Sequence, residues 1–344
     1  MSKIDEPLTD QPMPSGGGDV SAVDGRRNHR DMAGLLERNG LLILFVVIVV
    51  VFSFTAKDFF TANNFRITLG QQAVLGIVAL ASIVPLICGQ FDLSVATNVG
   101  ASGIVMATCM SRFRLPLVVA IAIAIAWCVL LGLVNGLLVA RVGVNSFIVT
   151  LASSTVVEGL VQWYTNGSTI SSRISHQLVQ VSTGNLAGIP KGLFWLAPVA
   201  VLLWYFLEHT PFGRHLHSTG SNRSAATIVG IPVARVVLAS FVICAVLGGV
   251  AGVLLVGQSG DADPEVAQGT LLLPALAAAF LGSSAFRSGK FNVPGTVLAV
   301  YFVAFSVAGL EFLGATSWVE LVFDGVALAG AVTVTTVLAR KGGR

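Results

Sequence analysis

The side chains that could carry chemistry in this 344-residue chain are few, and they do not form a catalytic pattern. None of the five histidines stands near a cysteine or a carboxylate at the spacing of a metal site. The four cysteines lie inside apolar runs without a paired CxxC spacing. The nearest approach to a phosphate-binding loop, Gly282 to Lys290, has Phe291 where that motif needs Ser or Thr. We therefore expect no enzymatic activity and no bound metal or cofactor, and any use of ATP would need an ATPase on another chain.

The acids inside the apolar sequence pose a different question. Asp92 stands between two apolar runs, and a carboxylate there should lie at an interface or face a wet cavity, because it is costly in hydrocarbon. Two interpretations are open: Asp92 or Ser94 caps the next helix, or the carboxylate belongs to a gate or a substrate path. Glu158 and Asp324 present the same choice between a helix-end acid near lipid headgroups and a partner in a cavity or between helices.

Several amides also lie in or near apolar runs. They could hydrogen-bond the hydroxyl groups of a sugar, and interhelical hydrogen bonding explains them equally well. These amides are Gln71, Gln72, Asn98, Asn135 and Gln162.

The composition indicates which solvent surrounds these residues. The chain is 54% hydrophobic and only 11% charged, with a mean hydropathy of +0.84, whereas soluble domains carry about 25% charged residues. Uncharged runs of about 20 residues are long enough to cross a bilayer. A net charge of +3 is too small to indicate a nucleic-acid partner. We therefore predict an all-α polytopic membrane protein with the lipid bilayer as its solvent.

About ten transmembrane helices are predicted from the apolar runs. The eighth is short and could cross only half of the bilayer. The ten runs are Gly40–Ala56, Ile67–Cys88, Leu93–Met110, Leu117–Ala140, Phe147–Tyr164, Gly192–Leu207, Val236–Gln258, Leu271–Phe286, Val293–Leu313 and Trp318–Ala339. Small residues such as those of Gly248–Gly252 are expected to let neighbouring backbones approach closely.

The basic residues predict the orientation of these helices. With a cytoplasmic start, six bases fall outside, Arg112 and Arg114 among them, and the other fourteen of the twenty fall inside, so both termini are expected in the cytoplasm. The fourteen are Lys3, Arg26, Arg27, Arg30, Arg38, Arg141, Arg214, Arg223, Arg235, Arg287, Lys290, Arg340, Lys341 and Arg344.

The same topology divides the chain into segments. Residues 1–36 are polar and rich in Gly and Pro, and they are expected to form a disordered cytoplasmic tail. Residues 37–340 form the membrane domain. It carries an external loop at 165–191 with its own small structure, an acidic outer loop at Ser259–Gln268, and a cytoplasmic loop at 209–233.

The cytoplasmic loop is the longest polar interruption in the second half of the chain, and Thr210–Pro232 holds four basic or imidazole side chains and no acid. It could be a solvated basic turn. It could also form a short amphipathic helix that docks on a partner, ended or bent by Gly230, because Gly tolerates the left-handed cap. The apolar contacts of that helix would be Ala225, Ala226, Ile228, Val229 and Ile231.

Four segments in order resemble one known family, the permease subunits of bacterial ABC importers for ribose, xylose, arabinose and related monosaccharides. Gly89–Val95 (GQFDLSV) is similar to the family signature Gly-Gly-Ile-Asp-Leu-Ser-Val-Gly. The other segments are Gly132–Gly136 with Phe147–Leu151, then Thr210–Arg214 with Gly220–Asn222 and Ala225-Ala226, and last Leu281-Gly282, Ser288–Lys290 and Pro294–Thr296. Together they cover the chain from about Gln71 to Leu338.

This sequence departs from the family pattern at several positions, and the changes bear on the substrate rather than on the fold. Gln90 and Ala96 replace glycines of the signature, and Ser283 replaces the second Gly of a late Leu-Gly-Gly. Asn145-Ser146 stand where the family usually has proline, and Ser224 stands where an acid often precedes Ala-Ala.

The resemblance implies a permease subunit of an ATP-driven, binding-protein-dependent monosaccharide importer. It would lie in the bacterial inner (plasma) membrane as a multi-pass homodimer, form the translocation pore, and work with a separate ABC ATPase that hydrolyses ATP and with a periplasmic sugar-binding protein. The implied ATPase-coupling residues are Gly213, Arg214, Ser221, Asn222, Ala225, Ala226, Gly230 and Ile231. The signature and pathway candidates are Gln71, Gln72, Asp92, Ser94, Asn135, Phe147 and Thr150.

Three alternatives remain open at this point. A related ABC permease for branched-chain amino acids would share the architecture, and only the signature around Asp92 favours sugar. An ion-coupled secondary transporter should show charged relays within its spans and discontinuous helices in matching halves, and few charges lie within the runs here. A membrane scaffold without transport activity would not need the cytoplasmic loop.

Overall fold

The structure is a computed structural model that describes residues 39–286, 289–316 and 318–342, and almost all of its regular elements are helices. The expected tail at 1–36, Arg287 of the basic turn and the final Arg344 lie outside the described residues. A first helix covers Asn39–Thr55. The others, in chain order, are α2 (Ala62–Gln71), α3 (Ala73–Ile87), α4 (Ser94–Ser111), α5 (Leu117–Leu137) with a π-helical turn η1 (Leu138–Val142), α6 (Ser146–Thr165), α7 (His176–Ser182), α8 (Leu193–His209), α9 (Pro211–Ser221), α10 (Arg223–Ile228), α11 (Val233–Ser259), the 3₁₀ turn η2 (Pro264–Gln268), α12 (Leu272–Gly282), α13 (Val293–Phe312) and α14 (Trp318–Gly342).

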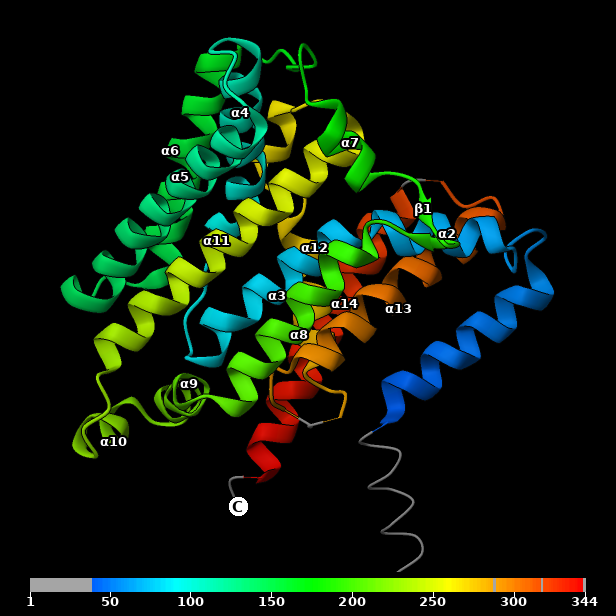
Figure 1. The fold of residues 1–344 in the computed structure, drawn as a ribbon. Coiled ribbons are helices and arrows are strands. Elements are labelled where there is room, and N and C mark those ends of the chain that lie inside the picture. The colour runs from blue at the N-terminus through cyan, green and yellow to red at the C-terminus, as the bar shows by residue number, and fades with distance from the viewer. Residues whose placement is uncertain (1–38, 287–288, 317, 343–344) are drawn as a thin grey trace, which may run out of the picture.

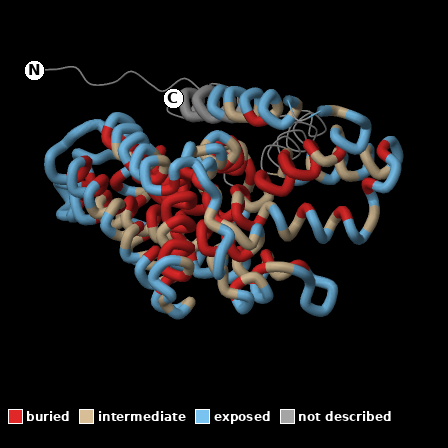
Figure 2. Tube along the Cα trace, turned by 90° about the horizontal axis from the view of Figure 1, so that it is seen from above, coloured by how far each residue is buried: buried red, intermediate tan, exposed pale blue. Residues whose placement is uncertain are grey.

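Helix α11 is the centre of the bundle. Its main neighbours are α3, α4 and α5, and a second group packs α12 against α3, α13 and α14. Figure 2 shows the buried residues gathered in the middle of the molecule, with exposed residues around the periphery. The predicted close backbone packing is confirmed at Gly252 of α11, where a Cβ would collide with Ser102 and with the Val99 carbonyl of α4.

Several helices are suited to a membrane by length and composition. Among the described residues, three are long and apolar enough to cross one, namely Leu117–Val142, Val233–Ser259 and Val293–Phe312, or up to five if each of two bent pairs is one span. Helix α12 has 11 residues and rises only about 16 Å at 1.5 Å per residue, which is short of the roughly 30 Å hydrocarbon core. The prediction that the eighth helix is short is therefore confirmed.

The loops gather at two opposite ends of the bundle (Figure 1). At the upper end, which we call the hairpin end, the predicted loop at 165–191 contains α7 and a small antiparallel hairpin of β1 (Asn185–Leu186) and β2 (Ile189–Pro190). An isolated bridge joins Ile170 of this loop to Ala262 of the acidic loop. At the lower end, which we call the coupling end after the predicted ATPase-coupling loop, lie α9 and α10, together with the start of the first helix and the last described turns of α14.

The second predicted span is wrong in one respect. The run Ile67–Cys88 was expected to be one helix after a loop at Lys57–Arg66, but helix α2 begins in that loop, at Ala62, and is separated from α3 by a bend of 40° at Gln72. Thr61 caps α2 by accepting a hydrogen bond from the Asn64 N–H, at 3.2 Å, and this local cap lets a helix start inside a polar segment.

Candidate functional site

The chain between α3 and α4, residues 88–93, forms a break whose last two residues, Asp92 and Leu93, are buried, whereas Gly89 and Phe91 are exposed; we call it the sealed break after its buried part. Its backbone is held by the first turn of α6. Ser146 Oγ accepts from the Phe91 N–H at 3.1 Å, and Thr150 Oγ1 accepts from the Leu93 N–H at 3.1 Å. The Thr150 hydroxyl in turn donates to the Ser146 carbonyl at 2.8 Å. Two side chains of α6 therefore satisfy amides that no helix serves.

Asp92 lies in this break and is buried. Its Oδ1 accepts from the backbone N–H of Ser94 at 3.0 Å and from the Ser94 hydroxyl at 2.6 Å. The Asn135 side chain of α5 donates to the same hydroxyl at 2.9 Å. Asp92 thus satisfies the first amide of α4, as a capping acid would, and it lines none of the described pockets.

Three of the signature residues, Asp92, Ser94 and Asn135, therefore form one buried polar cluster. Two of its atoms, Asp92 Oδ2 and Asn135 Oδ1, lack a hydrogen-bond partner among the described residues, as do both polar atoms of the buried Asn98 amide on α4. The cluster joins α4 to α5 through Ser94 and Asn135. This arrangement fits interhelical hydrogen bonding better than direct contact with a solute.

A second break, between α2 and α3, is different. We call it the open break, and Gln71 and Gln72 stand at it. The last carbonyls of α2 are satisfied by side chains from distant helices: the Tyr301 hydroxyl of α13 donates to Leu69 O at 3.1 Å, and Gln258 Nε2 of α11 donates to Gly70 O at 3.0 Å. Helix ends leave such carbonyls without an intrahelical partner, so these two donors stabilise the bend.

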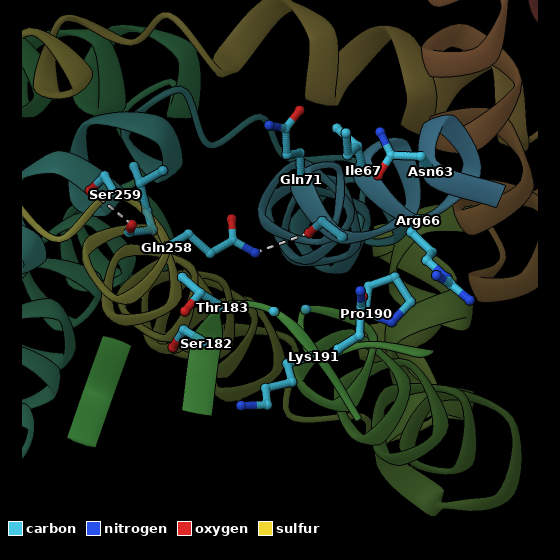
Figure 3. Close-up of a pocket in the computed structure, with 15 residues that line it drawn as sticks. Asn63, Arg66, Ile67, Gln71, Ser182, Thr183, Pro190, Lys191, Gln258 and Ser259 are labelled. Atoms are coloured by element: carbon cyan, nitrogen blue, oxygen red, sulfur yellow. Dashed lines mark hydrogen bonds between the residues drawn. The ribbon is translucent and has the colours of Figure 1, made fainter. Parts of the chain in front are cut away.

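The open break faces a cleft of about 520 Å³ at the hairpin end, here called the hairpin cleft. Figure 3 shows Gln258 reaching across it from α11 to the backbone of α2. Its lining includes Gln71, Arg66 of α2 and Lys191 beside the hairpin, and no acid. The Lys191 ammonium donates to the Gln180 carbonyl of α7, which fixes one wall.

At the coupling end, α9 leaves α8 through a tight corner. Thr210 caps α9 by accepting from the Gly213 N–H at 3.4 Å, and Pro211 takes the first helical position, where proline is favoured. A Cβ on Gly213 would collide with the Leu207 carbonyl, and a Cβ on Gly220 would collide with the Ile87 carbonyl at the end of α3. The two glycines let α9 pack directly on the ends of α3 and α8.

The short helix α10 carries an exposed apolar tip. Asn222 caps its start by accepting from the Ala225 N–H at 2.9 Å. Gly230 ends it with φ +83°, and the Gly230 and Ile231 N–H groups return to the carbonyls of Thr227 and Ala226, as in a Schellman motif. The predicted helix end at Gly230 is confirmed. Ile228 is 84% exposed and Val229 is 74% exposed.

Two predicted details of this loop are wrong. The loop holds two helices rather than one short amphipathic helix, because Asn222 begins a second helix immediately after α9 ends at Ser221. Ala226, expected among the partner contacts, is buried within the chain itself at 3% exposure. Its neighbour Ala225 is exposed, as is Arg214.

The predicted site residues thus separate into three places. Asp92, Ser94, Asn135 and Thr150 meet at the sealed break; Gln71 and Gln72 lie at the open break; the coupling residues lie in α9 and α10 or next to α10. Phe147 joins none of these groups, since its side chain is half exposed on α6. Tyr301, Gln258 and Lys191 were not among the predicted site residues. The amide of Gln258 at the end of an apolar run was a usable signal, whereas nothing local marks the tyrosine.

The comparisons with known proteins agree with this architecture. Residues 64–332 match the model of a family described as "Branched-chain amino acid transport system / permease component". The ribose import permease protein of Escherichia coli K12 is 30% identical over 318 residues, which is 92% of this chain and 98% of that protein. The L-arabinose ABC transporter permease protein of Azospirillum brasilense is 29% identical, covering 96% of each chain. The ribose import permease of Bacillus subtilis is 30% identical, covering 90% of this chain and 95% of that protein.

The chain belongs to this family of permease components. It is a multi-pass, helical membrane transport protein and not an enzyme. The match also counts against two of the alternatives that the sequence left open, the ion-coupled secondary transporter and the membrane scaffold.

Proposed function

We propose that this chain is the transmembrane permease subunit of an ATP-driven, binding-protein-dependent importer for a monosaccharide of the ribose, xylose or arabinose type. The names of the relatives support a sugar: ribose, L-arabinose and, at 26% identity, D-allose. The family description names branched-chain amino acids, so leucine is the competing substrate to test.

The proposal extends to the membrane topology. About ten spans cross the bacterial inner membrane, both termini are cytoplasmic, residues 37–340 form the permease domain and 1–36 form a cytoplasmic tail. The hairpin end then faces the periplasm, where a binding protein delivers the sugar, and the acidic loop after α11 suits a basic patch on that partner. Two copies of the chain enclose the pore, each contributing half.

The observation that carries the proposal is the tip of α10. Ile228 and Val229 expose their apolar side chains at a position fixed by the Asn222 cap and the Gly230 turn. Exposed apolar surface is stabilised when a partner covers it, by about 25 cal/mol per Å². A separate ATPase is that partner in this proposal, and its closure on ATP would move α9 and α10 against the ends of α3 and α8. This chain itself binds no cofactor, and ATP is hydrolysed by the partner.

The test combines co-purification with uptake. The intact chain is solubilised from its native membrane, and the ATPase and binding protein that accompany it are identified and reconstituted with it in proteoliposomes. ATP-dependent uptake of D-ribose, L-arabinose, D-allose and leucine is then measured. Sugar uptake supports the proposal. Uptake of leucine alone contradicts the substrate class, and uptake without ATP contradicts the importer class.

One variant isolates the coupling loop. The double substitution Ile228→Asp with Val229→Asp should lower ATP-dependent uptake at least about tenfold and reduce recovery of the ATPase, because two charges replace the apolar contact surface. The matched control for recovery of the ATPase is Leu186→Asp, an apolar-to-acid change at an exposed position (57%) on the opposite end, which should leave that recovery unchanged. Equal uptake in the double variant and the wild type would contradict the coupling role of the tip.

A further inference from the structure

A second pocket lies on the other side of α2 from the hairpin cleft. It has a volume of about 240 Å³ and is enclosed by α2, the start of α3, α12, α13 and the first turns of α14. Ile67 and Gln71 line both the cleft and this pocket, so α2 is a wall shared by the two. The charges differ: the lining here contains Glu311, Glu320 and Asp324 and no Lys, Arg or His. We call it the acidic pocket.

Asp324 has no structural partner that explains its burial. Asp324 is 5% exposed, and its Oδ1 atom is buried without a hydrogen-bond partner among the described residues. The nearest acid on the same helix is Glu320, one turn earlier on the same face, and like charges at this spacing repel. A buried acceptor without a donor is expensive to keep, and intramembrane acids usually face a cavity or a path for solutes. Asp92 Oδ2 also lacks a partner, but of the two acids only Asp324 lines a described pocket, so the arrangement at Asp324 points to a donor that comes from outside the chain.

The opposite wall offers polar groups that are still free. Asn64 and Thr68 are already engaged, since Asn64 donates to the Phe59 carbonyl at 2.8 Å and Thr68 donates to Asn64 at 3.3 Å. The side chains of Gln71 and Gln72 make no hydrogen bond with any other residue in the part of the chain that the structure describes. They are free because Tyr301 and Gln258 satisfy the backbone of the open break.

The donor set selects the chemistry of the ligand. A metal ion is not favoured, because the described residues contain no group of three or more His, Cys, Asp or Glu arranged to hold one. Separated carboxylates on one wall accept hydrogen bonds, and amides on the other both donate and accept. A molecule with several hydroxyl groups satisfies both walls at once, and Phe312, 44% exposed in the lining, offers a ring for its apolar face. The volume lies below the roughly 300–1,000 Å³ of sites for drug-sized ligands, which suits a monosaccharide of about ten non-hydrogen atoms.

We propose that the acidic pocket is a transient binding site for a neutral, polyhydroxylated solute of monosaccharide size on its way through the permease. Asp324 and Glu320 accept from its hydroxyl groups, and Gln72 and Gln71 hold its other edge. This inference rests on the proposed function, and it adds a location and a set of contact residues to it.

The experiment uses proteoliposomes that hold the full chain with its co-purified ATPase and binding protein. The probe is whichever of D-ribose, L-arabinose and D-allose the wild type imports, at a saturating concentration of loaded binding protein. Two quantities are measured: the ATPase rate stimulated by the binding protein, and the number of sugar molecules imported per ATP hydrolysed. The first reports assembly and coupling, and the second reports what happens to the sugar inside the permease.

Asp324→Leu should lower the sugar imported per ATP about tenfold, since a hydrogen bond to a charged group is lost in a desolvated site. Asp324→Asn keeps an acceptor and should lie between Leu and the wild type. Gln72→Leu, from the opposite wall, should cause a smaller loss. In all three the stimulated ATPase rate should stay within about twofold of the wild type, and the thermal stability of Asp324→Leu should not fall, because an unpaired buried charge is removed. The matched control Asp58→Asn changes an exposed acid outside the pocket and should leave both quantities unchanged.

Each outcome decides the proposal. Unchanged sugar per ATP in both Asp324→Leu and Gln72→Leu overturns it, as does a loss of transport that follows a loss of stability. A wild type that imports none of the three sugars overturns the proposed function itself, and the wild-type measurement alone separates that failure from a failure of the pocket.

Discussion

The sealed break and the open break interrupt the path of one stretch of chain at the two ends of α3, yet they are built in opposite ways. At the sealed break, backbone N–H groups donate to side chains of the break and of the adjacent helix α6: Ser94 N–H to Asp92, and Leu93 N–H to Thr150. At the open break, backbone carbonyls accept from two side chains that are distant in sequence, Tyr301 and Gln258. At the first, Asp92 Oδ1, Ser94 and Thr150 are engaged in these bonds and Asp92 lines none of the described pockets, whereas Gln71 and Gln72 of the second line pockets and remain available to a solute.

The difference gives a way to interpret polar residues in apolar spans. A polar side chain at a chain break belongs to a path only if other residues satisfy the backbone there and a cavity lies beside it. Asp92 fails the second condition, since it lines none of the described pockets, although it lies in the motif that carries the family resemblance. Gln72 meets both, although no motif marks it. We expect a signature residue of this kind to set the packing of α4 on α5 and α6, and the amides of the open break to set what passes.

The largest effect should come from removing a hydroxyl at the sealed break. Thr150→Val keeps the shape of the side chain and leaves the Leu93 N–H buried without an acceptor, so the free energy of unfolding should fall by about 1–3 kcal/mol. The measurement is equilibrium unfolding in mixed detergent micelles, followed with a thiol-reactive dye. The four cysteines are free and buried in the folded chain, which makes them reporters of unfolding.

Helix α6 supplies a matched control for that change. Thr155 makes only a local bond from its hydroxyl to the Leu151 carbonyl at 3.0 Å, on an exposed face. Thr155→Val should therefore alter the unfolding free energy by less than about 0.5 kcal/mol. If both threonine variants lost the same free energy of unfolding, the stability of the sealed break would not depend on the Thr150 hydrogen bond. That result would contradict the contrast between the sealed and the open break.

The sequence predicted the sealed break well and the open break poorly, and the reason is physical. Gly89 and Asp92 are local signals for a chain break, and the gap between α3 and α4 lies within a residue of the predicted one. The bend at Gln72 has no proline or charge beside it. It depends on donors that are 188 residues away, for Gln258, and 232 residues away, for Tyr301, and such contacts are fixed only when the helices pack.

The candidate site divides in the same way between local and distant signals. Capping signals around Asn222 and Gly230 predicted how the coupling loop is built, because caps are local. The direction of Ala226 was not predictable, since the face of a six-residue helix that turns inward is set by α9 and α11. The acidic pocket combines acids from α13 and α14 with amides from α2, so spacing along the chain gave no sign of it.

A smaller effect should come from the buried side of the open break. Tyr301→Phe removes the donor to Leu69 O and should lower the unfolding free energy by about 0.5–1.5 kcal/mol. The loss should be less than that of Thr150→Val, because a buried carbonyl that loses a donor is tolerated better than a buried N–H that loses its acceptor. Tyr205→Phe, on the exposed surface of α8, is the control and should be close to neutral. A loss larger than that of Thr150→Val would show that the open break is sealed from water as well.

The smallest effect should come from the side of the open break that faces the hairpin cleft. Gln258→Met keeps the length of the side chain and removes the donor to Gly70 O, at 3.0 Å. Because this group lines a cleft of about 520 Å³, a water molecule can take over the bond, at a cost of roughly 0–2 kcal/mol and usually much less. The unfolding free energy should therefore change by less than about 0.5 kcal/mol. A change as large as that of Thr150→Val would mean that the Gln258 amide is needed to hold the bend between α2 and α3. The open break would then depend on its buried hydrogen bonds as much as the sealed break does, and the distinction between the two would be contradicted.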